Sequence, residues 1–301
     1  MLLNILKILG KFFGWIPGFF ELIIDRIAGT RYQGKVLERN WAGQKLSFDL
    51  SDYIQRKAFF NCFERRELSF LRKSSELGST GIDVGANVGL ITLVMAQAVG
   101  TSGSVIALEP IPENFSRLKV ASQLHPQVKA RNIACGNGVT STLRLFRFHN
   151  PGSDYSKTSA WYSIVSNDPQ DTYIEVPCIR LEEQLTQDGV SHSISMLKID
   201  VEGAEELVLQ GCGRFLNPVS VSRLMLEAVV SKHGFREEDE RVFSILEEAG
   251  YKLCPISFMG NPMNCSLSRY VASRYHYVYW ALRYFPMLNL NYCAVAREFT
   301  T

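Results

Sequence analysis

A glycine-rich turn constrains the fold of this chain more than any other feature. Residues 81–89 read GIDVGANVG, in which an apolar strand leads into the turn and a helix is expected to open at about Val88. The strand shows no polar alternation, which is typical of a parallel sheet buried on both faces. Gly85 and Gly89 permit close approach of a ligand to the backbone, and the helix N-terminus adds a partial positive charge. The turn therefore predicts a nucleotide-type site at the carboxyl end of a parallel strand.

Strand-like and helix-like segments alternate after this turn, as in an α/β fold whose parallel sheet has helices on both faces. We expect strands at 80–85, 104–109, 128–134, 142–148, 173–178, 193–200, 221–229, 251–254 and 291–297. Helices are expected at 88–99, 112–124, 181–187, 204–210 and 236–249. A chain of 301 residues can form one large domain of this kind.

The sequence pattern divides the chain into an N-terminal region and a single domain. We expect an amphipathic helical region at 1–33 and a single domain at 34–301. Within that domain, residues 33–80 hold a β-hairpin around Ala42-Gly43 and a helix at 52–77, and the α/β core occupies 81–301.

Residues 1–28 carry apolar side chains at helical spacing. Their charges leave an uncharged run of nine residues, Phe12 to Phe20, whereas a spanning helix needs ~20 apolar residues. Two interpretations stay open. The helix lies in a membrane surface with Trp15 at the interface, or it packs on its own domain or on a partner chain.

Composition excludes several classes of protein. The net charge of +2 disfavours a general nucleic-acid binder, although residues 1–80 hold 13 basic and 8 acidic side chains. The seven cysteines are odd in number and form neither Cys-x-x-Cys nor a zinc-type spacing. We therefore expect no metal and a reducing compartment: a cytoplasmic protein, peripheral on the inner face of a membrane if residues 1–28 bind lipid.

The polar residues of the turn favour a nucleoside without phosphate. Asn87 stands where a dinucleotide fingerprint has its second glycine, and its side chain would crowd a diphosphate. Asp83 would repel an anion and attract a cation. Glu109 ends the second strand, where a carboxylate can accept both ribose hydroxyls. A cationic nucleoside of this description is S-adenosylmethionine.

Four runs resemble the FkbM-type S-adenosylmethionine-dependent methyltransferases: IDVGANVGLIT, IALEPIPENFSRL, NIACGN and LKIDVEGAEELVLQG. The resemblance covers about residues 34–297, and its motif core is 81–212. It implies a Rossmann-like seven-stranded methyltransferase sheet, and methyl transfer to a hydroxyl of a sugar, glycolipid or natural product. Residues 1–28 and about 270–285 lie outside the pattern.

The resemblance also implies roles for individual residues. Asp83, Gly85, Asn87 and Gly89 would surround the methionine and ribose ends of the cofactor, and Glu109 would hold the ribose hydroxyls. Asn132 to Ala134 would lie by the adenine. The second block holds the carboxylates Asp200, Glu202 and Glu205 together with Lys198, at the rim toward which the methyl group should point.

A general base would assist a hydroxyl acceptor. We favour Asp200 or Glu202, with Glu227 and His233 as further candidates. Two aromatic regions could form the acceptor site. They are 149–171, with Tyr155, Ser156, Ser159, Trp161 and Tyr162, and 270–285, with Tyr275, His276, Tyr277, Tyr279, Trp280 and Tyr284.

Competing functions stay open at this point. An NAD-dependent oxidoreductase and a non-catalytic membrane-associated nucleoside-binding scaffold are the rivals, and the acceptor atom could be a nitrogen or belong to a small lipid.

Overall fold

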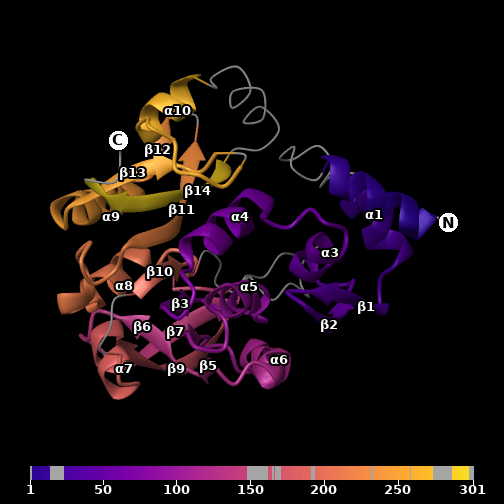
Figure 1. Ribbon diagram of the computed structural model, residues 1–301, viewed down its shortest axis with the longest axis horizontal. Helices are drawn as coiled ribbons and strands as arrows, with labels where there is room; N and C mark the ends of the chain where they lie inside the picture. Colours follow the sequence, from indigo (N-terminus) through magenta and orange to yellow (C-terminus); the bar gives the residue numbers. More distant parts are fainter. Residues whose placement is uncertain are drawn as a thin grey trace.

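The main sheet of the computed structural model has the strand order β13-β14-β11-β10-β3-β4-β5 (Figure 1). The structure describes residues 2–13, 24–147, 162–164, 166, 171–190, 194–231, 233–257, 259–273 and 287–297. The seven strands are β3 (Thr80–Val84), β4 (Ser104–Leu108), β5 (Val128–Arg131), β10 (Ile194–Ile199), β11 (Arg223–Ser231), β13 (Tyr251–Pro255) and β14 (Met287–Ala296). A two-residue strand, β12 (Gly234–Phe235), pairs with β11 outside this order.

The strand directions create a switch point in the middle of the sheet. β5, β4, β3, β10 and β11 run parallel, whereas β14 is antiparallel to both of its neighbours. From β3 the chain proceeds to β4 on one side, and it later returns to place β10 on the other side. Ligands of open α/β sheets bind outside the carboxyl ends of the strands at such a reversal. We call this region, formed by the residues that follow β3, β4 and β10 together with the end of β11, the carboxyl edge.

Helices cover both faces of the sheet, as the sequence predicts (Figure 1). α4 (Arg65–Ser74), α5 (Leu90–Val99) and α6 (Pro112–Ala121) lie on one face, and α7 (Leu181–Gln187), α8 (Glu205–Gly211) and α9 (Glu237–Glu248) on the other. Within β10, Met196 belongs to the core under α5 and its neighbour Leu197 to the core under α8. Because both faces are buried, the strand reads as a continuous apolar run.

A second sheet departs from the sequence-based prediction. Residues 128–134 were expected to form one strand, but β5 ends at Arg131 and β6 (Ala134–Gly136) pairs in parallel with β9 (Thr172–Arg180). β9 also pairs with β7 (Thr142–Arg147), and β7 pairs with β8 (Tyr162–Ser163). The break has a physical cause, because the Asn132 side chain donates to the carbonyl oxygens of Glu109 and Pro110 and turns the chain away from the main sheet.

The segment before β3 contains the predicted hairpin, β1 (Val36–Trp41) and β2 (Gln44–Asp49), with its turn at Ala42-Gly43. The helix predicted at 52–77 is instead two helices, α3 (Tyr53–Phe59) and α4. Asn61 and Glu64 adopt positive φ angles of 65° and 37° between them. Backbone in this left-handed region cannot continue a right-handed helix, so the chain bends there.

The N-terminal helix α1 (Leu2–Phe13) packs on its own chain near α3 (Figure 1). Leu6 is 2% exposed within the core that includes Phe59, and Asn61 donates to the carbonyl oxygen of Lys7. Residues 14–23, which include Trp15, lie outside the described residues. Among the described helices, none has the length and apolar character to cross a membrane.

The remaining described elements are short. They are the π-helical turn at Asp25–Gly29, the 3-10 turns at Ser122–Leu124 and Gly213–Phe215, and α10 (Leu267–Ser273). All seven cysteines are free thiols.

Candidate active site

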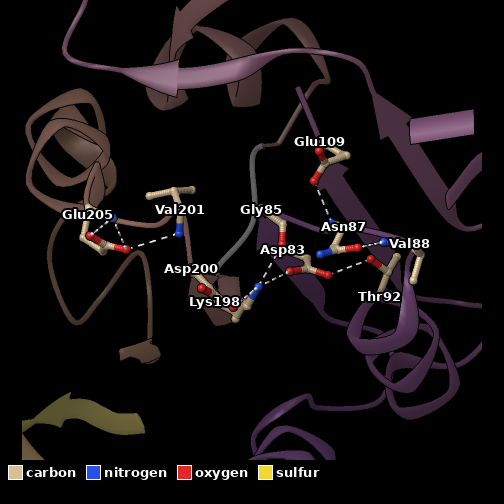
Figure 2. Close-up of polar contacts among 11 residues, drawn as sticks. Asp83, Gly85, Asn87, Val88, Thr92, Glu109, Lys198, Asp200, Val201 and Glu205 are labelled. Atoms are coloured by element: carbon tan, nitrogen blue, oxygen red, sulfur yellow. Dashed lines mark hydrogen bonds and ion pairs between the residues drawn. The ribbon is translucent and has the colours of Figure 1, made fainter. Parts of the chain in front are cut away.

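The glycine-rich turn after β3 is fixed to the end of β4. The N–H groups of Gly85 and Ala86 both donate to the Leu108 carbonyl oxygen at 3.0 Å. Asn87 follows with φ 52°, and its side-chain oxygen accepts the N–H of Val88 at 2.7 Å (Figure 2). Asparagine tolerates the left-handed region better than most residues because its short polar side chain hydrogen-bonds locally. The turn thus leads into α5, whose N-cap is Gly89.

The two glycines of the turn have packing reasons of their own. A Cβ atom on Gly85 would lie 1.9 Å from the Asp200 carbonyl oxygen, and one on Gly89 would lie 2.8 Å from Leu118 Cδ1. Both residues also have positive φ angles, 79° and 90°. The sequence suggested these glycines for the approach of a ligand. The structure shows that Gly85 permits the turn to meet the loop after β10, and that Gly89 permits α5 to pack on α6.

Glu109 is the carboxylate that organises the β4 side of the carboxyl edge. It is 4% exposed, and its two oxygens accept the N–H groups of Asn87 at 2.7 Å and Ile111 at 2.9 Å. Burial raises the pKa of Glu109 to about 7, against the opposing effect of the hydrogen bonds from Ile111, Asn87 and the Asn114 side chain. A carboxylate has about four acceptor positions, so its oxygens can accept further hydroxyl donors.

Beneath the turn, Lys198 joins the ends of β3 and β10. Its ammonium nitrogen lies 3.4 Å from Asp83 Oδ1 and 3.2 Å from Asp200 Oδ2, and it donates to the Gly85 carbonyl oxygen at 2.9 Å (Figure 2). Burial lowers the pKa of Lys198, but Asp200 and Asp83 outweigh burial and leave it above its ordinary value. Lys198 is therefore charged, and it fixes the two strand ends to each other.

Asp83 and Asp200 differ in accessibility. Asp83 is fully buried, and its second oxygen accepts the Thr92 hydroxyl at 2.6 Å. The Asp200 side chain keeps 34% exposure. The structure thus places Asp83 under the turn, where it shapes the site from below. Direct contact of Asp83 with a cofactor stays a prediction, and Asp200 is the member of the pair that faces outward.

The loop after β10 separates the two glutamates of the second block. Glu205 is 9% exposed, and its carboxylate accepts the N–H groups of Val201 at 3.2 Å and Gly203 at 3.1 Å (Figure 2). The sequence suggested three carboxylates at the rim. The structure differs, because the Glu205 side chain turns back on its own loop and holds its shape at the N-terminus of α8.

Glu202 is exposed in that loop, as is Gly203, and has a left-handed φ of 51°. This backbone is uncommon for glutamate and costs free energy, and residues strained in this way cluster at functional sites. Burial of its carboxyl group by the surrounding protein, together with the charges of Asp200 and Glu205, raises the pKa of Glu202 to about 8. The rest of the residue keeps solvent contact. A carboxyl group with this pKa holds its proton at neutral pH and becomes a proton acceptor as the pH approaches 8.

Further carboxylates reach the same region from other elements. Glu227 lies one residue beyond the pairing of Ile199 with Leu226, level with the end of β10. Burial raises its pKa well above the ordinary value, and Asp200 and Glu202 add to the shift. Glu64, in the turn before α4, has a pKa raised to about 8 by burial and then by Asp200.

Sequence reasoning missed Glu64. The residue lies outside every recognised motif, and it reaches Asp200 only because the chain bends between α3 and α4. No pattern in residues 52–77 predicts that bend.

The other sequence candidates divide into three groups. Asn132 lies beside Glu109, and Ala134 is buried in the cluster that contains Ile111. His233 is exposed on the β11–β12 hairpin, where its N–H donates to Ser231 Oγ. Tyr155, Ser156, Ser159, Trp161 and residues 274–286 lie outside the described residues. Among the described side chains, no group of three or more His, Cys, Asp or Glu could hold a metal ion.

Comparison with known proteins decides the family. The model of the methyltransferase FkbM domain matches residues 83–253, which is more than half of the chain and includes both motif blocks. The chain belongs to the FkbM methyltransferase family. A curated relative, "Methyltransferase 1" of Beauveria bassiana (strain ARSEF 2860), is 32% identical over 142 residues. The aligned segment covers 43% of this FkbM-family chain and 57% of that relative.

Solved structures with a similar arrangement are distant in sequence. A SAM-dependent O-methyltransferase from Thermotoga maritima is 13% identical with a TM-score of 0.40, covering 88% of this chain and 78% of its own. Aeropyrum pernix fibrillarin with natively bound S-adenosyl-L-methionine is 10% identical with a TM-score of 0.40, covering 88% and 83%. Because both TM-scores are below 0.5, the fold assignment depends on the strand order of the sheet.

Proposed function

We propose that this FkbM-family protein is an S-adenosylmethionine-dependent O-methyltransferase that acts on a hydroxyl of a sugar, glycolipid or natural product. The observation that carries the proposal is the buried Glu109 carboxylate beside the Asn87 turn at the switch point of the sheet. It offers acceptors to ribose hydroxyls, and the neighbouring groups are carboxylates rather than the donors that a diphosphate needs. Family membership favours this proposal over an NAD-dependent oxidoreductase.

The chain's own residues fit the cofactor in three places. Glu109 would accept the ribose hydroxyls, and Asn132 and Ala134 would border the adenine. Asp200 would attract the positive charges of the methionine end, and those charges would in turn favour the ionised forms of Glu64 and Glu227, whose pKa values are raised without the cofactor. Bound at this edge, the cofactor would supply an electrophilic methyl group.

Glu202 serves as the general base in this proposal, with Asp200 beside it. An effective base has a pKa near the working pH, and the pKa of about 8 meets that condition. Asp200 favours the protonated form of Glu202 and so raises its proton affinity. Glu202 is also the more exposed of the two, which gives an acceptor hydroxyl access to its carboxylate.

An extract screen tests the activity. The full chain is incubated with S-adenosylmethionine and a glycan and glycolipid extract, and mass spectrometry measures the addition of a methyl group to extract components. The proposal expects methylated hydroxyl compounds that are absent without the protein. Methylation confined to amines would contradict the O-methyltransferase assignment.

We further propose that α1 holds the protein on the cytoplasmic face of an anionic membrane. Leu6 faces the core, but Ile5 and Ile8 on the other side of α1 are 43% and 56% exposed, and Lys11 follows one turn later, exposed as well. Exposed apolar residues with adjacent lysine are typical of an interfacial helix. The free thiols support a reducing compartment.

Vesicle sedimentation tests this second proposal. The Ile5→Ser/Ile8→Ser variant should lose binding to phosphatidylglycerol vesicles that the unmodified chain retains. A matched control removes two apolar residues that are exposed elsewhere, Val120→Ser/Leu124→Ser, and should bind normally. Equal sedimentation of both variants and the unmodified chain would contradict the role of α1.

A further inference from the structure

The two-residue strand β8 belongs to the second sheet yet reaches the carboxyl edge. It pairs antiparallel with β7, so that Tyr162 lies opposite Arg147 and Ser163 opposite Phe146. Neighbouring residues of a strand point to opposite faces, so the two side chains of β8 make different contacts. Those contacts connect β8 to two parts of the candidate active site: the loop after β10, which holds Glu202, and the residues around Glu109 after β4.

Ser163 provides the connection to the proposed base. Its hydroxyl donates to the Glu202 carbonyl oxygen at 3.1 Å, and the residue is 8% exposed. The loop in which Glu202 adopts its left-handed backbone is therefore held from outside the main sheet by β8.

Tyr162 provides the connection to the residues around Glu109. Its half-buried ring packs against the cluster that contains Ile111 and Ala134. Ile111 donates its N–H to Glu109, and Ala134 is one of the residues that the resemblance places by the adenine. Burial raises the pKa of Tyr162; Arg147 lowers it, and Glu113 and Glu109 raise it.

The span of β8 follows from these contacts. Ser163 reaches the loop after β10, and Tyr162 reaches the residues around Glu109. Figure 2 shows Glu109 and Val201, at the start of that loop, on opposite sides of Gly85. A ligand held by Glu109 above the turn would therefore lie in the interval that β8 bridges.

We propose that Tyr162 is a cofactor-binding residue whose ring covers the adenosine moiety, and that Ser163 holds the strand in place for this contact. The inference rests on the proposed function, because it takes S-adenosylmethionine as the ligand of Glu109. Stacking of an aromatic ring on a nucleic-acid base stabilises binding by about 1–3 kcal/mol, whichever base it is.

Calorimetric titration with S-adenosylhomocysteine tests the contact on the full chain. Tyr162→Leu keeps an apolar side chain on the cluster but removes the ring, and we expect about 10-fold weaker binding. Tyr162→Phe keeps the ring and should stay within about 2-fold of the unmodified chain. The matched control is Tyr173→Leu, on β9 of the same sheet, where the tyrosine is 50% exposed and packs on Phe146. This control should bind normally.

A second measurement needs no variant. Tetranitromethane nitrates accessible tyrosines, and peptide mass spectrometry locates the nitrated sites. Saturating S-adenosylhomocysteine should protect Tyr162 several-fold and leave Tyr173 nitrated to the same extent.

The outcomes separate this inference from the proposed function. If the unmodified chain binds S-adenosylhomocysteine but Tyr162→Leu binds equally well, or Tyr162 is not protected, the inference is wrong and the proposed function stands. A loss in Tyr162→Phe as large as in Tyr162→Leu would also overturn the role of the ring. If the unmodified chain does not bind the nucleoside, the proposed function fails and the inference fails with it.

Discussion

Two groups of carboxylates lie at the carboxyl edge, and they differ in what surrounds them. Asp83 and Asp200 share the ammonium group of Lys198, which also binds the Gly85 carbonyl oxygen. Glu202 and Glu227 lie beside further carboxylates, and their pKa values are raised, for Glu202 to about 8. Lys198 joins the first group to both β3 and β10, whereas the carboxyl groups of the second hold protons near neutral pH. The difference suggests that one group maintains the architecture and the other takes part in the chemistry.

Replacing the carboxyl group of Glu202 with a neutral amide is the strongest test of the difference between the two groups of carboxylates. With an acceptor found by the extract screen, Glu202→Gln should lower the rate of methyl transfer by about 10²–10⁴-fold, because the acceptor hydroxyl loses its base. In the unmodified chain the rate should rise with pH up to about 8, where the carboxyl group of Glu202 loses its proton.

The control for this variant is Glu206→Gln. Glu206 lies four residues along the chain, and its carboxylate binds Arg241 at 2.8 Å. A rate unchanged in Glu202→Gln, or reduced equally in Glu206→Gln, would remove Glu202 from the chemistry.

Removing the cation shared by Asp83 and Asp200 should instead destabilise the fold. Lys198→Met leaves the fully buried Asp83, and Asp200 beside it, without their shared cation, and we expect about 3–5 kcal/mol less free energy of unfolding in urea. The exposed pair of Lys45 with Glu38 at 3.0 Å gives a matched control, because Lys45→Met should cost about 1 kcal/mol or less. Similar losses in the two variants would show that the Lys198 network is not structural.

The pH dependence of stability gives a smaller effect. The pKa values of Glu109 and Glu202 are raised to about 7 and about 8, so the folded chain holds protons that the unfolded chain releases above pH 4.5. These two groups therefore favour folding most below that pH, and their contribution falls as the pH rises toward 8. The melting temperature should decrease between pH 5 and 8, and Glu109→Gln should reduce that decrease. A slope unaffected by the substitution would contradict the raised pKa of Glu109.

The sequence predicted the features that depend on local pattern. The buried apolar strands, the glycine turn and Glu109 all appear in runs of adjacent residues, and the resemblance implied a Rossmann-like seven-stranded sheet. The structure adds features that depend on contacts between distant segments. Gly85 is required by the Asp200 carbonyl oxygen, which follows the neighbouring strand β10, more than a hundred residues later in the chain. Glu64 joins the site only through the bend before α4.

Glu205 and β6 are further features that the sequence pattern alone does not predict. A carboxylate at the start of a helix can face a ligand or its own loop, and only the positions of the Val201 and Gly203 N–H groups decide between them. Residues 128–134, VKARNIA, read as one strand because no glycine or proline marks an end to it. The hydrogen bonds of Asn132 that break the strand involve Glu109 and Pro110, more than twenty residues earlier.

The most direct test of the account is a calorimetric titration of the unmodified chain and of Glu109→Gln with S-adenosylhomocysteine and with NAD. We predict that the unmodified chain binds S-adenosylhomocysteine and not NAD, and binds it more weakly at pH 6 than at pH 8, because Glu109 is protonated below about 7. Glu109→Gln should bind about 10–100-fold more weakly through the loss of charged hydrogen bonds, while Glu113→Gln, exposed on α6, should bind normally. Binding of NAD alone, or unchanged affinity of Glu109→Gln, would contradict the central claim that this carboxylate holds the ribose of a phosphate-free nucleoside.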